Sequence, residues 1–173
     1  MAKLKILEYP AEELTKSARK VGRNDMEFVT RLVHEMKDAM IEGNGVGLAA
    51  NQVGELVRVI VVRDIEMDEV NYYINPTIVD GRGEEMDEEG CLSFPGLCGL
   101  VPRYEAITVK FQDLGLNTYR VELEGIHARI LQHEIDHLNG LTIRDRTTVE
   151  LYHRKDDEDE EPPQRRRRRA MLN

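Results

Sequence analysis

The sequence predicts an α+β fold, with mixed antiparallel β-sheets around a central helix. Three observations carry this prediction: an amphipathic helical pattern near the N-terminus, short β-branched segments through the middle, and a second helical pattern near the C-terminus. A chain of 173 residues is long enough for one ordinary domain and short for two. We therefore expect a single hydrophobic core.

An amphipathic helix is predicted over residues 25–41. Its apolar residues recur at spacings of three and four, at Met26, Val29, Leu32, Val33, Met36, Ala39 and Met40. Asn24 or Asp25 is the expected N-cap. The glycines of Gly43-Asn44-Gly45 permit the positive φ that ends a helix.

The middle of the chain is predicted to be mostly β. Strands are expected at residues 58–62, 71–75, 76–79, 106–113 and 119–123. Pro76 should limit the strand before it, because proline cannot donate to a β-ladder. Turn residues at 114–117 join the last two strands.

The second helix is predicted over residues 126–138 and carries the segment QHEIDH. Ile126, Ile130, Leu131, Ile135 and Leu138 give the helical spacing, and a glycine at 140 ends it. The segment that follows is a short strand or a short helix. We assign residues 1–150 to the domain and residues 151–173 to a charged C-terminal tail. Opposite charge blocks around Pro-Pro predict disorder from residue 156 onward.

Charge and composition exclude several classes of protein. The net charge of -9 argues against DNA as a partner, because duplex binding normally needs a basic face. No segment has the length of a membrane span, and the N-terminus lacks the apolar run of a secretory signal. Two cysteines seven residues apart are then weak evidence for a disulfide. A cytoplasmic setting is expected.

His133 and His137 suggest a metal site. Residues four apart lie on one face of a helix, so both imidazoles can approach one ion, and Glu134 between them can reach a bound water. This pattern, H-E-x-x-H, is typical of metal hydrolases, although such histidine pairs also occur in ordinary helices. Two imidazoles do not complete a site, so a third ligand is needed.

Cys91 in EEGCLSFPG is one candidate for the third ligand, because a thiolate binds metals strongly. Cys98 is interpreted as inert packing. A metalloprotease of the H-E-x-x-H type would instead take a downstream His or Glu as ligand, and the chain offers His153, Glu150 and the acidic residues of the tail there. None stands at a persuasive spacing.

A third segment, GVGLAANQ at residues 45–52, combines small residues with an amide. Its glycines and alanines allow another backbone to lie close, and Gln52 can donate a hydrogen bond to an oxygen that gains charge. The segment lacks the third glycine of a dinucleotide-binding fingerprint and precedes a strand instead of following one. By itself it predicts only a loop.

Together, GVGLAANQ, EGCLS and HEIDH resemble the motifs of the peptide deformylase family, in the same order, over about residues 3–147. The resemblance implies removal of the N-formyl group from formyl-methionine of new polypeptides, with release of formate. It implies that Cys91 is the third metal ligand beside His133 and His137. It also implies Fe²⁺ as the native metal, with Zn²⁺ or Ni²⁺ able to replace it; the residues alone fit several divalent ions.

The resemblance further implies roles for the residues around the metal. Glu134 would be the general base, and the Gln52 side chain and the Leu92 backbone N–H would stabilise the oxyanion.

An extended peptide would hydrogen-bond to the backbone of Val46, Gly47 and Gly90. Its methionine side chain would enter a pocket formed by Val46, Ile130 and the His133 ring.

Two features lie outside the resemblance. Arg129, one turn before His133, is interpreted as a solvent-facing or salt-bridged residue; the alternative is that it lines the mouth of the pocket and meets substrate carbonyls. The arginines at 165–169 are interpreted mainly as part of a solvated tail, and contact with ribosomal RNA is the alternative. A catalytically silent binding module is the alternative to an enzyme, and the presence of both Glu134 and Gln52 argues against it.

Overall fold

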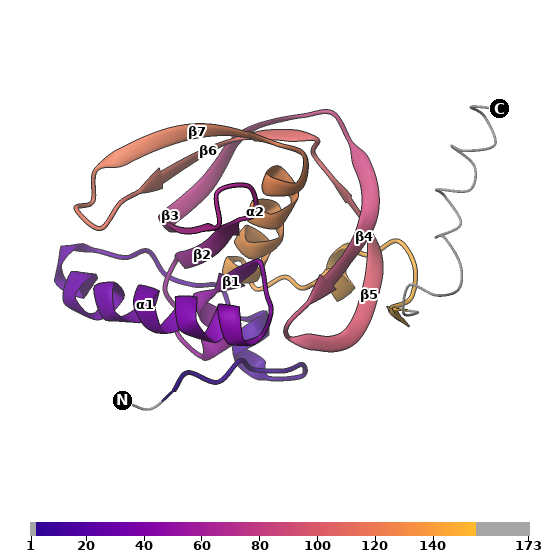
Figure 1. Cartoon of the computed structure of the whole chain (residues 1–173), viewed down its shortest axis with the longest axis horizontal. Helices are drawn as coiled ribbons and strands as arrows, with labels where there is room; N and C mark the ends of the chain where they lie inside the picture. The colour runs from indigo at the N-terminus through magenta and orange to yellow at the C-terminus, as the bar shows by residue number, and fades with distance from the viewer. Residues whose placement is uncertain (1–2, 155–173) are drawn as a thin grey trace.

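The computed structural model describes residues 3–154, and two antiparallel sheets and three helices make up most of that part (Figure 1). The helices are α1 (Met26–Glu42), α2 (Gly125–Leu138) and α3 (Ile143–Arg146), with short 3-10 turns η1 (Glu12–Thr15), η2 (Arg23–Asp25) and η3 (Ala50–Val53). The strands are β1 (Gly47–Ala49), β2 (Val59–Asp64), β3 (Glu69–Arg82), β4 (Glu85–Cys91), β5 (Phe94–Arg103), β6 (Ala106–Gln112), β7 (Thr118–Glu124) and β8 (Tyr152–His153).

The larger sheet has the strand order β1-β2-β3-β6-β7, and the smaller sheet has the order β4-β5-β8. Every strand pair in both sheets is antiparallel. Helix α2 lies between the sheets and contacts β1, β2, β3, β6 and β7 (Figure 1). This arrangement confirms the predicted α+β fold with antiparallel sheets around a central helix. None of the helices within residues 3–154 is long and apolar enough to cross a membrane.

The hydrophobic core has two parts, one on each side of the larger sheet. One part packs α1 against β2, through residues that include Val33, Met36, Met40, Val59 and Val61. The other packs α2 against the same sheet, through residues that include Ile60, Val62, Val109, Leu131 and Ile135. Alternate residues of β2 thus serve opposite faces, as expected for a strand buried on both sides.

Helix α1 begins where the sequence predicts, with Asp25 at the N-cap position. The Asp25 carboxylate makes no capping bond to α1. It accepts the backbone N–H of Gly22 at 2.7 Å and pairs with Arg19. The side chain therefore stabilises the turn before the helix.

The prediction that Pro76 limits a strand is wrong, because β3 continues through it as one strand from Glu69 to Arg82. The register with β6 shifts between Ile74 and Thr77, and Asn75 has a φ of 52°. A bulge at this point removes the need for a ladder donor at the proline. The two predicted strands are therefore one bent strand.

Strands β4 and β5 were not predicted. β4 is rich in acidic residues, and β5 contains Pro95 and two glycines, compositions that are depleted in strands. They pair with each other along most of their lengths, with a bulge between Gly90 and Cys91. The pairing of β4 with β5 forms a hairpin with Cys91 at its tip. Local strand propensity does not predict this pairing.

The segment after α2 contains both a short helix, α3, and a short strand, β8. β8 pairs with β5 through Tyr152 and His153, two residues of the segment assigned to the tail. The remaining part of the predicted tail, with the arginines at 165–169, lies outside the described residues.

Candidate metal centre and active site

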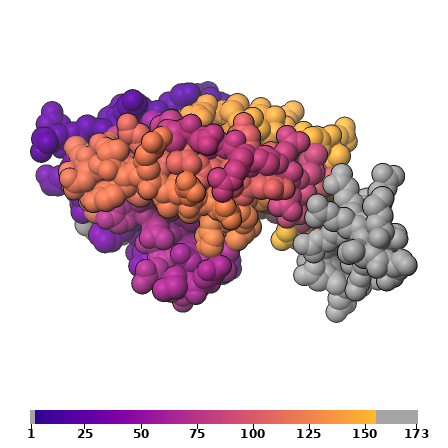
Figure 2. Space-filling view, turned by 90° about the horizontal axis from the view of Figure 1, so that it is seen from above, coloured from indigo at the N-terminus to yellow at the C-terminus, as the bar shows by residue number. Residues whose placement is uncertain are grey.

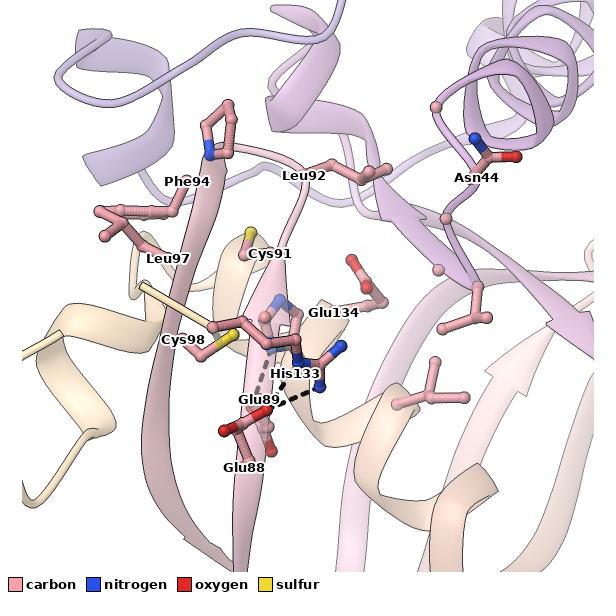
Figure 3. A pocket seen from close by; sticks show the side chains of 18 of the residues that line it. Asn44, Glu88, Glu89, Cys91, Leu92, Phe94, Leu97, Cys98, His133 and Glu134 are labelled. Atoms are coloured by element: carbon pink, nitrogen blue, oxygen red, sulfur yellow. Dashed lines mark hydrogen bonds and ion pairs between the residues drawn. The ribbon is translucent and has the colours of Figure 1, made fainter. Parts of the chain in front are cut away.

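Three ligand atoms converge from two elements, and Figure 3 shows two of the three residues, Cys91 and His133. His133 and His137 lie one turn apart on α2, and Cys91 ends β4. The two Nε2 atoms are 3.2 Å apart, and Cys91 Sγ is 3.2 Å from Nε2 of His137. All three ligand atoms lie within 4.8 Å of one another. The structure therefore brings together the three residues predicted as metal ligands.

This donor set fits a divalent metal ion. Metal–ligand distances of about 2.0–2.3 Å put neighbouring ligand atoms of a tetrahedron roughly 3.3–3.7 Å apart. The separations of 3.2 Å in this site are close to those edges. One thiolate and two imidazoles also leave a fourth position for water, as in catalytic zinc sites.

The carboxylate of Glu89 lies behind His133, away from the ligand atoms. Its Oε2 is 2.9 Å from Nδ1 of His133, and Arg103 donates to both of its oxygens at 2.9 and 3.0 Å. Arg129 donates to Oε1 at 2.8 Å. Burial raises the pKa of Glu89, but hydrogen bonds from His133 and Arg103 outweigh it and hold the pKa well below the ordinary value. Glu89 is therefore an ionised acceptor.

Glu134 points from α2 toward β1, and its side chain is buried. Its Oε1 lies so close to Gly47 that an added Cβ there would be 2.4 Å from it. Its Oε2 is buried and has no hydrogen-bond partner among residues 3–154. Burial raises the pKa of Glu134 to about 7. This carboxyl group can therefore exchange a proton near neutral pH.

Gln52 is buried in η3, and its amide is oriented by its neighbours. Its Oε1 accepts the backbone N–H of Ala49 at 2.9 Å. The amide nitrogen is thereby directed toward Ser93 Oγ at 3.2 Å and Cys91 Sγ at 3.6 Å. A donor thus stands beside the ligand atoms.

A cavity of about 580 Å³ opens over these groups. Its wall includes all the residues predicted to bind substrate, together with most of the predicted catalytic and metal residues: Val46, Gly47, Gly90, Ile130, Gln52, Cys91, Leu92, His133 and Glu134. His137 lies deeper and is reached through Cys91 and His133. Figure 3 shows Cys91, His133 and Glu134 directed toward the same space.

The cavity lies between two edge strands, β1 of the larger sheet and β4 of the smaller sheet. Arg63 N–H donates to Val46 C=O, and Gly47 is paired with Val62. Hydrogen-bonded and non-bonded pairs alternate in antiparallel sheets, so the N–H and C=O of Gly47 point away from β2. These groups are directed to the open edge of β1.

The sequence did not single out Glu89 or Arg103. Glu89 is the first residue of EGCLS, and Arg103 lies outside the three motifs. Both are buried charged residues, and their contacts with Asp136 and His133 of α2 mark them only in the folded structure. Arg129 is salt-bridged, as predicted, but it is buried and lines the cavity. Cys98 is buried and not in a disulfide, and burial raises the pKa of its thiol. The packing interpretation of Cys98 therefore holds, although this residue also lines the cavity wall.

Comparisons with known proteins agree on one family. The family model described as polypeptide deformylase matches residues 3–151. A peptide deformylase of Dictyoglomus thermophilum is 48% identical over 137 residues, which is 79% of this chain and 88% of that protein. Peptide deformylase 1 of Bacillus cereus is 42% identical over 149 residues, 86% of this chain and 94% of that protein. The crystal structure of peptide deformylase from Thermotoga maritima matches with a TM-score of 0.81 at 37% identity, covering 86% of this chain and 100% of that one.

Proposed function

The chain belongs to the polypeptide deformylase family, and we propose that Cys91, His133 and His137 hold its metal while Glu134 is the base of the reaction. Its reaction is the removal of the N-formyl group from nascent peptides by a metal-dependent amide hydrolysis. The convergence of one thiol and two imidazole nitrogens at the floor of the cavity is the observation that carries this assignment.

A divalent ion held by these three residues would supply Lewis acidity, lowering the pKa of water at its open position and polarising the formyl carbonyl. We propose Fe²⁺ as the native ion, on the basis of the sequence resemblance, with Zn²⁺ or Ni²⁺ as replacements. A set of one sulfur and two nitrogen ligands accepts all three ions, and their availability decides which one is bound.

Glu134 handles the protons of the reaction in this proposal. Its carboxylate takes a proton from the attacking water and delivers it to the leaving amine. Two observations support this role: the pKa is about 7, and Oε2 is buried without a protein partner among the described residues. A base with a pKa near neutrality accepts and returns a proton with little loss in either direction.

The developing oxyanion is stabilised by Gln52 and by the backbone N–H of Leu92. The bond from the Ala49 N–H to Oε1 of Gln52 directs the amide N–H groups toward Cys91 Sγ and Ser93 Oγ, beside the site that we assign to the reacting atoms. Because this bond fixes the side chain before substrate binds, little reorganisation is needed in the transition state.

The peptide lies extended between the edges of β1 and β4. The N–H and C=O of Gly47 are directed to one side of it, and Gly90 lies on the other. Val46 precedes β1, and its N–H donates no hydrogen bond to another backbone group within residues 3–154. We therefore assign this N–H to the peptide and the Val46 side chain to the methionine pocket. Ile130 and the His133 ring complete that pocket.

Nascent peptides are the family's substrates, so we place this reaction in the cytoplasm. Contact between the arginines at 165–169 and ribosomal RNA remains a prediction. Removal of residues 162–173 would test it, because unchanged co-sedimentation with ribosomes at low salt would contradict it.

The experiment that tests the proposed function measures formate released from formyl-Met-Ala-Ser by anaerobically purified, iron-loaded protein. The parent should be active, whereas Cys91→Ser and Glu134→Ala should be inactive. An active Cys91→Ser variant would contradict the ligand assignment, and an active Glu134→Ala variant would contradict the base.

A further inference from the structure

A row of alternating charges leads from the protein surface to His133. Arg146 donates to both oxygens of Asp136, from Nε at 2.9 Å and from Nη2 at 2.6 Å. Arg103 donates to Asp136 Oδ2 at 2.5 Å and to both oxygens of Glu89. Glu89 in turn accepts from Nδ1 of His133 at 2.9 Å. Each group in this row is held by the one before it.

The row begins at solvent and ends in the interior. The side chain of Arg146 is 45% exposed, whereas those of Asp136, Arg103 and Glu89 are 8%, 5% and 5% exposed. Charges in a poorly hydrated interior interact more strongly than charges in water. Loss of the charge of Arg146 therefore affects the buried partners, because they cannot replace the lost hydrogen bonds with bonds to water.

We infer that Arg146 is a positioning residue that sets the affinity of the metal site through Asp136, Arg103 and Glu89. The inference rests on the proposed function, in which His133 is a ligand. Arg146 lies on α3 and touches none of the three ligand residues in any described contact. Any effect of Arg146 on metal affinity therefore passes through Asp136, Arg103 and Glu89.

The physical reason lies in how Arg103 divides its donors. Its Nη1 donates to Asp136, and its Nε and Nη2 donate to Glu89. Without Arg146, Asp136 loses the donor to its Oδ1 and attracts the Arg103 guanidinium more strongly. Because a guanidinium is planar and rigid, a shift of Arg103 toward Asp136 weakens its hydrogen bonds to Glu89. Glu89 then orients the His133 ring less firmly.

The effect should be smaller than that of removing Glu89 itself. Arg129 also donates to Glu89, at 2.8 Å, and would keep part of its position. Residues that act through a network change the coupled binding by about 2- to 30-fold. We expect a change within that range for Arg146→Gln.

Arg144 provides a matched control on the same helix. It stands two residues before Arg146, but its guanidinium contacts the hydroxyl and ring of Tyr9 instead of Asp136. Arg144→Gln removes the same charge from α3 and leaves the row intact. It should leave metal affinity unchanged.

The experiment measures transfer of Zn²⁺ from the loaded full-length protein to an excess of a chromogenic chelator. Arg146→Gln should weaken Zn²⁺ binding by about 2- to 30-fold. Arg146→Lys should give an intermediate loss, because lysine keeps the charge but not the fork. In a Glu89→Gln background, Arg146→Gln should have no further effect, since the row is already broken.

Equal losses for Arg144→Gln and Arg146→Gln would overturn the inference, and so would an Arg146 effect that persists in full without Glu89. A variant that merely destabilises the fold would give that additive pattern. If Arg146→Gln does not fold, Arg146→Lys is measured in the parent and in the Glu89→Gln background instead. A loss of Zn²⁺ affinity that disappears in the Glu89→Gln background supports the inference, and a loss that persists overturns it. A Cys91→Ser protein that holds Zn²⁺ as tightly as the parent would instead reject the proposed metal site.

Discussion

Nδ1 of His133 donates a hydrogen bond to Oε2 of Glu89 over 2.9 Å. An ionised carboxylate can only accept, so this bond fixes the ring tautomer and leaves the lone pair of Nε2 facing Cys91 and His137. A partner of this kind orients a ligand and raises its basicity.

Glu89→Gln is therefore expected to weaken metal binding by about 10- to 100-fold. The amide keeps the shape of the side chain, but it carries no negative charge to hold the Nδ1 proton. Chelator competition with Zn²⁺ measures the change. Glu88→Gln is the control, because Glu88 pairs with Tyr152 and Arg154 and not with His133. Equal losses in both variants would contradict the prediction.

Gly47→Ala should lower kcat/KM by about 100-fold, the cost of displacing a reacting group by about 1 Å. The new methyl group would lie 2.4 Å from Oε1 of Glu134 and would push this base away. Gly22→Ala is the control, since its methyl group would lie 3.7 Å from Oδ2 of Asp25, an ordinary contact distance. Steady-state kinetics with a formylated tripeptide compares the two. Full activity of Gly47→Ala would show that activity does not depend on the observed position of the Glu134 carboxylate.

Gln52→Ala should lower kcat by about 10²- to 10³-fold with little change in KM, as expected for a donor that acts mainly in the transition state. Gln52→Glu retains an oxygen for Ala49 but replaces the amide donor by an acceptor. It should be at least as inactive. A kcat for Gln52→Glu close to that of the parent would contradict a role of the Gln52 amide in stabilising the oxyanion.

Glu134 should make the metal-free protein less stable as the pH rises. Its pKa is raised by burial from 4.5 to about 7, so the folded state holds this proton more tightly than the unfolded chain. The resulting stability is complete below pH 4.5 and is lost as the pH rises to about 7. Glu134→Gln lacks this dependence and should gain on the parent by about 3 kcal/mol across that window. Urea unfolding at several pH values measures it, and parallel stability curves would contradict it.

Air exposure should affect the activity of the iron-loaded and nickel-loaded proteins differently. Ferrous iron bound by the Cys91 thiolate is oxidisable, so the iron-loaded protein should lose activity in air while the nickel-loaded protein keeps it. Formate release followed over time measures both forms. Equal decay of the two would count against an iron-specific loss.

Local patterns in the sequence determined several elements and the placement of the two histidines on one helix face. The spacing of apolar residues is a property of one segment, so α1 and α2 were predicted almost to their ends. The two histidines needed only a helix to share a face, which four-residue spacing guarantees. Cys91 was only a candidate on its own chemistry, and the resemblance to the peptide deformylase family selected it as the third ligand.

Only the tertiary structure decided what surrounds those ligands. Glu89 and Arg103 meet α2 through pairing of β4 with β5, a contact between segments whose composition disfavours strands. The continuation of β3 through Pro76 likewise depends on a bulge against β6. The direction of the Gly47 backbone depends on its register with Val62. A segment's sequence reports its own conformational preferences, whereas buried charge networks and sheet edges arise from partners far away in the chain, which only the folded structure brings together.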